Sequence, residues 1–514
     1  MKRVHGRAAL ALAVVALVTF GTQARRLGFY LDDWVMLERL LGASGWWDGV
    51  RSLAQTNFAF RTLSLVVFPT WYACFGSNPA GWQASLVVLD WALAWLLYLW
   101  LRDWLRAERP ALVAAALALM LPICPSSHYW ITNLSQRLAL PLAVGALILH
   151  RRWLQDRDPR RLWLALGTYA ASLLLYESGA FFPGVQAAAY FVGLRQAGKE
   201  TKDAAKKTAL DVLAPFAAAL AAAAAWRLLY PWLFGHGFPV GLSLSPASVF
   251  RNYFAAAVSW GPELVSLCRR VSIVWRAFFT DAEKILWLLF TLGGAAALSR
   301  VSDEKPSGRG LLVGAAIAAS GFVFAYLPFA LSGAYEPQVV GILSRVNAAG
   351  VLFLGVALAC ALEALALWAD GRGWGKAGAW GRAALLACMI GPFTWTNWYI
   401  GGTWAEAYKI EESILSGIRD WLAKLPDIHT IVLQEAPSNY SGAEVFSAHW
   451  GFDAALRIRS GRKDVTGMIV QPTMRTEKRG LVDYAFDPPH VAPYDGMLLY
   501  HVPSGQMKRP VAAE

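Results

Sequence analysis

Two adjacent carboxylates, Asp32 and Asp33, follow directly on the first apolar segment of the chain. Carboxylates can take up protons as general bases, and they can bind divalent cations through their oxygens. Charged groups at a membrane face are costly, so a pair of them at this point indicates a functional site. The alternative is the start of an ordinary loop, because most charged side chains at protein surfaces are only solvated.

The composition indicates a polytopic membrane protein. Of the 514 residues, 56% are hydrophobic and only 16% are charged, whereas charged residues make up roughly a quarter of soluble globular domains. The net charge of +12 comes from short Lys and Arg clusters between apolar segments, which is typical of membrane orientation and not of nucleic-acid binding. The five cysteines are scattered without CxxC spacing, which argues against a disulfide framework or a zinc site.

The apolar segments predict about 11 transmembrane helices. The first follows Lys2, Arg3 and Arg7 and ends near Phe20; because no good cleavage site follows, we expect it to stay as a span with a cytoplasmic N-terminus. The later spans are expected near residues 82–101, 109–125, 137–150, two short spans hinged at 176–179, 210–230, 284–299, 310–331, 346–368 and 382–400. Basic clusters alternate with these spans and predict that the connections carrying them are cytoplasmic.

Two apolar segments are less regular. The run that follows Arg61 and ends at Pro69 is too short to span, so we expect a helix in the membrane interface within a first outer loop at residues 25–81. The stretch 250–276 contains Glu263 and stops at Arg269. Counting it as a span would place the C-terminal region in the cytoplasm, so we expect it to be interfacial or re-entrant.

The character of the chain changes after residue 400. Residues 401–514 contain many charged residues and no segment long enough to span, and they are numerous enough for a small domain. A helix is expected over 410–425, and strands are expected at 430–433, 468–471 and 497–502. We therefore expect a transmembrane domain over residues 1–400, followed by a small α/β domain over 401–514 on the outer side of the membrane.

The order of these features resembles the GT-C membrane glycosyltransferases. The acids at 32 and 33 are followed by RTLS at residues 61–64 and by NPAGW at residues 78–82, which opens the second span. The closest resemblance is to the branch with protein O-mannosyltransferases and their bacterial relatives, although Thr62 stands where that branch usually has proline. The resemblance covers about the first 195 residues by motif, and the succession of spans extends it to about residue 400.

The resemblance implies an inverting transfer of a sugar from a polyprenyl-phosphate donor to an acceptor hydroxyl at the outer face of the membrane. Such a displacement needs a carboxylate as general base, a role that falls to Asp32 or Asp33. Adjacent side chains diverge, so we expect only one of them to point into the site. The leaving phosphate needs cations, and the candidates at the outer face are Arg61, Arg137 and Arg345. Each arginine could instead be an interface anchor.

The substrate-binding candidates are His128, Glu177 and Trp34. His128 lies beside Trp130 in a polar outer loop, where a histidine is more often a satisfied interface residue. Glu177 lies between two short apolar segments, where an unpaired carboxylate would be costly. Arg345 follows an outer loop that includes residues 333–338, where GT-C enzymes often bring a ligand for the lipid phosphate.

The sequence thus predicts an integral, multi-pass enzyme of a bacterial inner or plasma membrane, with the C-terminal domain periplasmic or extracellular. The expected partners are a polyprenyl-phosphate sugar, a glycan, lipid or protein acceptor, and membrane lipids. No nucleic acid, metal or other cofactor is expected, although the two acids could hold a divalent cation. A transporter or flippase of lipid-linked glycans and a non-catalytic envelope assembly protein are the alternatives; the first would be expected to show repeated halves.

Overall fold

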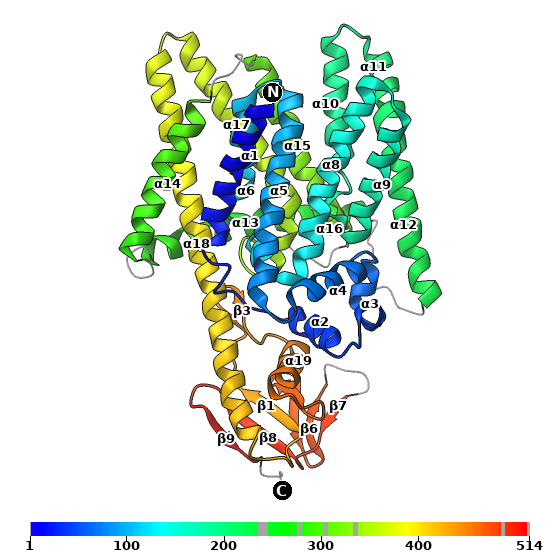
Figure 1. The fold of residues 1–514 in the computed structure, drawn as a ribbon, viewed down its shortest axis with the longest axis vertical. Helices are drawn as coiled ribbons and strands as arrows, with labels where there is room; N and C mark the ends of the chain where they lie inside the picture. The colour runs from blue at the N-terminus through cyan, green and yellow to red at the C-terminus, as the bar shows by residue number, and fades with distance from the viewer. Residues whose placement is uncertain are drawn as a thin grey trace.

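A computed structural model describes residues 2–234, 245–274, 280–301, 307–332, 338–484 and 489–510 of the chain. The molecule is a helical bundle with a small domain of strands and one helix at one end (Figure 1). The chain begins at the far end of the bundle, so the N-terminus and the C-terminal domain lie at opposite ends. The predicted combination of a helical multi-pass domain and a C-terminal α/β region is confirmed.

The bundle is built from helices of very different lengths. Its helices are α1 (Lys2–Ala16), α5 (Pro79–Leu105), α6 (Glu108–Met120), α8 (Leu134–Asp156), α9 (Pro159–Leu175), α10 (Phe182–Gln196), α11 (Thr201–Thr208), α12 (Ala214–Phe234), α13 (Pro246–Val274), α14 (Asp281–Ser299), α15 (Gly308–Ala325), α16 (Leu327–Ser332), α17 (Ala348–Gly371) and α18 (Gly375–Leu422). Among the described residues, six helical segments are long and apolar enough to cross a membrane. The expected number of about 11 is therefore not confirmed, because helices such as α6 and α10 are shorter than the roughly 20 residues of a full span.

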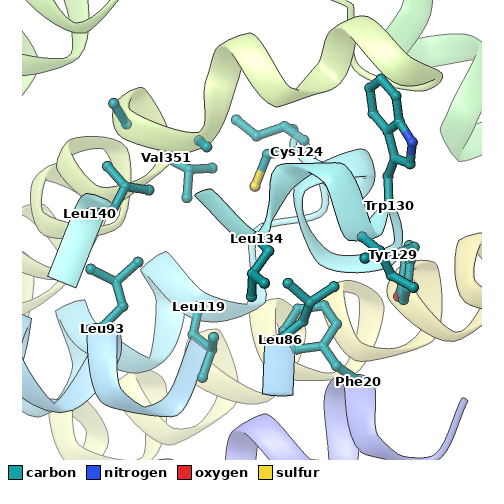
Figure 2. Packing of buried hydrophobic residues seen from close by; sticks show 14 of the residues in the cluster. Phe20, Leu86, Leu93, Leu119, Cys124, Tyr129, Trp130, Leu134, Leu140 and Val351 are labelled. Atoms are coloured by element: carbon teal, nitrogen blue, oxygen red, sulfur yellow. The ribbon is translucent and has the colours of Figure 1, made fainter. Parts of the chain in front are cut away.

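Helix α6 lies at the centre of the bundle. Ten of its 13 residues are apolar, and most of these are small or aliphatic residues with almost no exposed surface. Helix α17 packs directly on it, and a Cβ atom added at Gly355 would come within 2.5 Å of the backbone of Ala118. The glycine thus permits this close approach. Figure 2 shows Leu119 of α6 in the buried core that also contains Leu93, Leu140 and Val351 of neighbouring helices.

The segment expected as the first outer loop, residues 25–81, forms a layer between the bundle and the C-terminal domain (Figure 1). It contains the helices α2 (Asp32–Leu41), α3 (Trp46–Ala54) and α4 (Ser64–Phe75), with the 3-10 helix η2 (Asn57–Phe60) between the last two. Helix α4 has 12 residues and is too short to span a membrane. This layer carries both acids and Arg61.

Helix α18 joins the two parts of the molecule. It runs for 48 residues from the bundle along the C-terminal domain, so the domain boundary expected at residue 400 falls inside a helix. The glycines at 401 and 402, where the composition changes, do not interrupt this helix. A Cβ atom at Gly401 would lie 2.9 Å from Cγ of Gln23, so this glycine makes room for the segment that leads into the first outer loop.

The C-terminal domain contains a four-stranded sheet of order β4-β1-β8-β9. Strand β1 (Thr430–Gln434) is central and pairs in parallel with β4 (Thr466–Ile469) and β8 (Met497–His501), while β9 (Gln506–Lys508) is antiparallel to β8. The three strands expected from the sequence are confirmed. The domain also contains α19 (His449–Ser460), the hairpin of β2 (Asn439–Tyr440) and β3 (Ala443–Glu444), and a second sheet of β5 (Met474–Glu477), β6 (Gly480–Asp483) and β7 (His490–Ala492).

Of the irregular stretch 250–276, residues 250–274 belong to α13, a 29-residue helix that contains Pro262, and residues 275–276 lie outside the described residues. It does not meet the hydropathy criterion for a span. Most of the outer loop expected before Arg345, at residues 333–337, lies outside the described residues.

Candidate active site

A sharp turn of the backbone precedes the two acids. Leu31, the residue before them, has a φ of 46° and a ψ of −109°. Bulky residues rarely adopt positive φ values, and the strain of such a conformation is commonly found at functional sites. The turn starts α2 at Asp32, so that consecutive side chains point in different directions. As the sequence predicts, the two carboxylates have different surroundings.

Asp33 is fully buried and its oxygens are saturated with hydrogen bonds. Oδ2 accepts from the backbone N–H groups of Tyr30 (3.0 Å) and Ile131 (3.3 Å), and Oδ1 accepts from the backbone N–H (2.7 Å) and the hydroxyl of Thr132. Burial raises the pKa of Asp33 to about 7, although the hydrogen bonds from Thr132 and Tyr30 oppose this shift. Asp33 therefore ties the start of α2 to the 3-10 helix η3 (Ile131–Asn133).

Asp32 is only partly buried and faces charged groups. Its Oδ1 accepts a hydrogen bond from Nε1 of Trp450 in α19 (2.9 Å). Burial raises the pKa of Asp32, whereas the hydrogen bond from Trp450 and the positive charges of Arg345 and Arg61 lower it. Of the two acids, Asp32 is thus the one that shares its surroundings with two of the predicted phosphate-binding arginines.

Glu177, in the 3-10 helix η4 (Glu177–Gly179), holds two arginines. Its Oε1 lies 3.6 Å from Nη2 of Arg61 and its Oε2 lies 3.0 Å from Nη1 of Arg227 in α12. Burial alone would raise the pKa of Glu177, but Arg61 and Arg227 lower it to about 2. The guanidinium of Arg61 also lies 3.9 Å from the centre of the Tyr176 ring. The predicted substrate residue Glu177 is therefore an ionised carboxylate that positions arginines.

Arg345 comes from a distant part of the chain, the 3-10 helix η6 (Ile342–Asn347). Its guanidinium lies 4.8 Å from the centre of the Trp130 ring, and Nε2 of Gln136 donates to its backbone carbonyl (3.0 Å). We call Asp32, Arg61, Glu177, Arg227 and Arg345 the acid–arginine cluster. It combines three guanidinium groups with two carboxylates.

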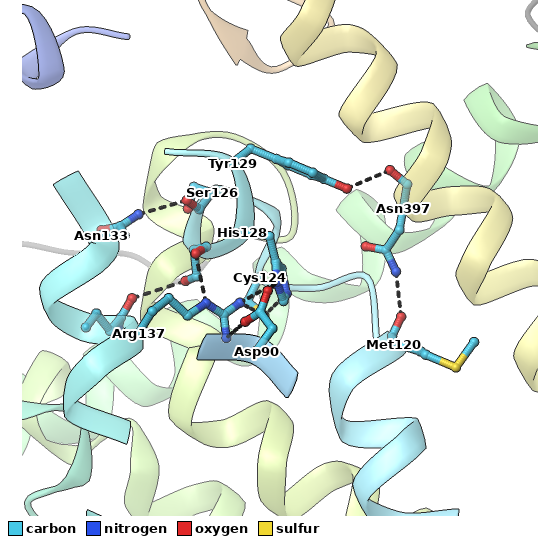
Figure 3. Close-up of polar contacts among 11 residues, drawn as sticks. Asp90, Met120, Cys124, Ser126, His128, Tyr129, Asn133, Arg137 and Asn397 are labelled. Atoms are coloured by element: carbon cyan, nitrogen blue, oxygen red, sulfur yellow. Dashed lines mark hydrogen bonds and ion pairs between the residues drawn. The ribbon is translucent and has the colours of Figure 1, made fainter. Parts of the chain in front are cut away.

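Arg137 and His128 form a different cluster, shown in Figure 3. Nη1 of Arg137 lies 3.1 Å from Oδ1 of Asp90 in α5, and Nε of Arg137 donates to the carbonyl of Ser127 (2.8 Å). Nδ1 of His128, in the short helix α7 (Pro125–Tyr129), lies 2.8 Å from Oδ2 of Asp90 and 2.7 Å from Nη2 of Arg137. Burial and Arg137 lower the pKa of His128 to about 4. All three side chains are buried, so Arg137 is engaged in a neutral ion pair inside the bundle.

Trp34, the third predicted substrate residue, is also buried. Its Nε1 donates to Oε2 of Glu411 in α18 (3.0 Å), and the guanidinium of Arg459 lies 5.0 Å from the centre of its ring. The side chain has no exposed surface. Trp34 thus fixes α2 against α18 and the C-terminal domain.

A cavity of 350 Å³ lies at the seam between the bundle and the C-terminal domain. Its walls include Glu263, Gln338 and Tyr399 from the bundle and Asn439 and Glu444 from the β2–β3 hairpin. Carboxylate, amide and hydroxyl groups dominate this set. The charge of Asp32 acts on Glu444, so the cavity borders the acid–arginine cluster.

No protein-family model matches the sequence, and no curated protein matches it. Among solved structures, the chain is similar to ArnT from Cupriavidus metallidurans bound to undecaprenyl phosphate, with 14% identity and a TM-score of 0.37 over 91% of this chain and 86% of that chain. It is also similar to the Archaeoglobus fulgidus oligosaccharyltransferase tethered with an acceptor peptide, with 14% identity and a TM-score of 0.39 over 92% of this chain and 64% of that chain. Values this low assign no function, so the function has to be argued from the site.

Two residues of the site, Arg227 and Trp450, are not predicted from the sequence. Arg227 lies in the alanine-rich helix α12, and a single arginine within an apolar segment could have marked it as a site residue. Trp450 lies 418 positions from Asp32, and nothing in its local sequence indicates that contact. In the part of the chain that the structure describes, no three His, Cys, Asp or Glu side chains are grouped closely enough to hold a metal ion.

Proposed function

We propose that this protein is a membrane glycosyltransferase of the GT-C kind. It transfers a sugar from a polyprenyl-phosphate donor to an acceptor hydroxyl at the membrane face that carries the C-terminal domain. The observation that supports this proposal best is the position of Asp32, a partly exposed carboxylate within electrostatic reach of Arg61 and Arg345. A base beside two cations is the combination that a displacement with a phosphate leaving group requires.

In the proposed reaction, Asp32 takes the proton from the acceptor hydroxyl while the oxygen of that hydroxyl attacks the anomeric carbon of the donor sugar. The bond from that carbon to the carrier phosphate breaks, and the electron pair stays on the phosphate. Arg61 and Arg345 stabilise the negative charge that develops there. Attack from the face opposite the leaving group inverts the configuration of the sugar.

The other residues of the site act through these three. Asp33 fixes the start of α2 and therefore the position of Asp32. Glu177 holds Arg61 beside Arg227, and a second positive charge nearby favours binding of a phosphate. We assign the 350 Å³ cavity to the acceptor, because its amide, hydroxyl and carboxylate groups can hydrogen-bond a polyhydroxylated molecule.

The proposal can be tested with purified full-length protein in lipid nanodiscs. A panel of undecaprenyl-phosphate monosaccharides is added with a membrane extract as the source of acceptor, and release of undecaprenyl phosphate is measured by mass spectrometry. We expect one donor to be consumed, and Asp32→Asn to slow its consumption at least about 100-fold. Asp420→Asn is the matched control, since the Asp420 side chain on α18 is 70% exposed.

Consumption of the donor by Asp32→Asn at the rate of the unchanged protein would contradict the proposal. Movement of the donor across the bilayer without release of the carrier would instead support a flippase.

A further inference from the structure

A second cavity, of 590 Å³, lies at the opposite end of the bundle. The C-terminal ends of α5, α8 and α10 and the first turns of α15 surround it. In Figure 1 this is the end at which α1 begins, far from the C-terminal domain. The acid–arginine cluster therefore contributes no residue to this cavity, and binding there is independent of the proposed function.

The cavity is positively charged. Arg106 and Arg151 both line it, and no Asp or Glu is among its described lining residues. Arg151 donates to the backbone carbonyl of Asp103, whose carboxylate forms an ion pair with Arg102 and also acts electrostatically on Arg151. Ser307, which caps the N-terminal end of α15, lies on the same wall, and the N-terminal end of a helix carries a partial positive charge. Two positive charges on a wall whose described residues include no carboxylate favour binding of an anion.

The remaining walls are amphipathic. Trp104, Leu154, Val192 and Leu311 provide apolar surface, while Gln186 provides an amide. Gln186 is held firmly: its Oε1 accepts from Nε1 of Trp100 (3.1 Å), and its Nε2 lies 2.8 Å from Nδ1 of His150. Such a lining suits a ligand with an anionic head and an apolar body.

We propose that this cavity binds the phosphate group of an anionic phospholipid from the leaflet at the α1 end of the bundle. Two arginines can hold the phosphate oxygens through charge-assisted hydrogen bonds. Tryptophan and aliphatic side chains can pack against the glycerol and the upper acyl chain. Basic pockets between membrane helices are suited to such headgroups, because they complement the charge while the walls exclude water.

The site can be tested by binding to purified full-length protein in a neutral detergent. The probes are phosphatidylglycerol, phosphatidylcholine and inorganic phosphate, and the readouts are native mass spectrometry and the shift in thermal unfolding temperature. We expect phosphatidylglycerol to bind and to stabilise the protein more than phosphatidylcholine does. The double variant Arg106→Gln, Arg151→Gln should bind phosphatidylglycerol at least about 10-fold more weakly than the unchanged protein does. The control Arg160→Gln, which removes an exposed arginine outside the cavity, should bind it normally.

A second variant tests the cavity without changing its charge. Gly193 lines it, and a Cβ atom added there meets no atom within 4 Å, so Gly193→Phe can be accommodated in α10 and should fill the space. We expect Gly193→Phe to fold and to lose phosphatidylglycerol binding. Normal binding by both the double variant and Gly193→Phe would overturn the proposal. Equal stabilisation by inorganic phosphate alone would overturn it too, since a lipid would then not be the ligand.

Discussion

Nε1 of Trp450 donates a hydrogen bond to Oδ1 of Asp32 over 2.9 Å, and thereby connects the C-terminal domain to the first residue of α2. An ion pair between Arg457 of α19 and Glu38 of α2 supports the same contact. Helix α19 approaches the strained turn closely, because a Cβ atom at Gly451 would lie 3.1 Å from Cα of Leu31. The C-terminal domain is therefore built into the candidate site and is not a separate appendage.

We predict that Trp450→Phe shifts the pH dependence of transfer. Burial raises the pKa of Asp32 and the Trp450 hydrogen bond lowers it, so removal of this donor raises the pKa further. Since the base must be deprotonated, the acidic limb of the kcat/KM profile should move to higher pH. Trp421→Phe, which changes an exposed tryptophan of α18, is the control. An unchanged limb would show that Trp450 has only a packing role.

We predict opposite effects for the two acids. An amide at position 32 can still accept a hydrogen bond from Trp450. The free energy of unfolding of Asp32→Asn should therefore lie within about 1 kcal/mol of that of the unchanged protein, while its activity is lost. An amide at position 33 turns an NH₂ group toward N–H donors, so Asp33→Asn should lose about 1–3 kcal/mol of stability. Thermal unfolding and donor consumption, measured together, test both. Full stability of Asp33→Asn with complete loss of transfer would make Asp33 the base.

The membrane architecture could be predicted because it depends on composition and on segment length. Apolar runs predicted most of the long helices, and short alternating runs predicted β1, β4 and β8. The continuation of α18 through Gly401 could not be predicted, because a pair of glycines at a change of composition favours a boundary, and the contact with Gln23 that accounts for Gly401 comes from the other end of the chain. The apolar run 109–125 predicts one span, whereas α6 ends at Met120, because hydropathy alone does not show where the helix inside an apolar run ends.

The candidate site could be predicted only in part. Residue types in the loops that the sequence predicts to be outside the membrane indicate Asp32, Arg61, Glu177 and Arg345, which the structure brings into one cluster. The sequence could not separate these from Arg137, because an arginine at the mouth of a span looks the same whether its partner is a ligand or Asp90. That distinction depends on which helices pack together.

We predict that Glu177→Gln lowers both stability and donor binding. The change removes the partner of Arg61 and Arg227 and leaves their like charges side by side, which should cost about 1–3 kcal/mol and raise the KM for the donor. The pKa of Glu177 falls from 4.5 to about 2 on folding, so its contribution is present above pH 4.5 and is lost as the pH falls toward 2. The difference in unfolding temperature between the two proteins should shrink over that range.

The matched control is Glu406→Gln. Glu406 has the same side-chain exposure as Glu177, 32%, and its partners Arg26 and Lys409 are both more exposed. Screening by water weakens such pairs, so we expect a smaller loss of stability and an unchanged KM. An equal loss of stability in both variants would mean that the ion pairs of Glu177 with Arg61 and Arg227 contribute no more than ordinary surface ion pairs.

We predict that Arg137 acts on stability and not on donor binding. Arg137→Gln leaves the carboxylate of Asp90 buried without its counter-charge, which should cost about 3–5 kcal/mol. Asp90→Asn should be similarly harmful, whereas the double variant should recover part of the loss, because neither charge is then left alone. Thermal unfolding of the three variants measures this coupling. If Arg137→Gln were as stable as the unchanged protein and yet failed to bind the donor, the phosphate-binding role suggested by its place in the sequence would be correct.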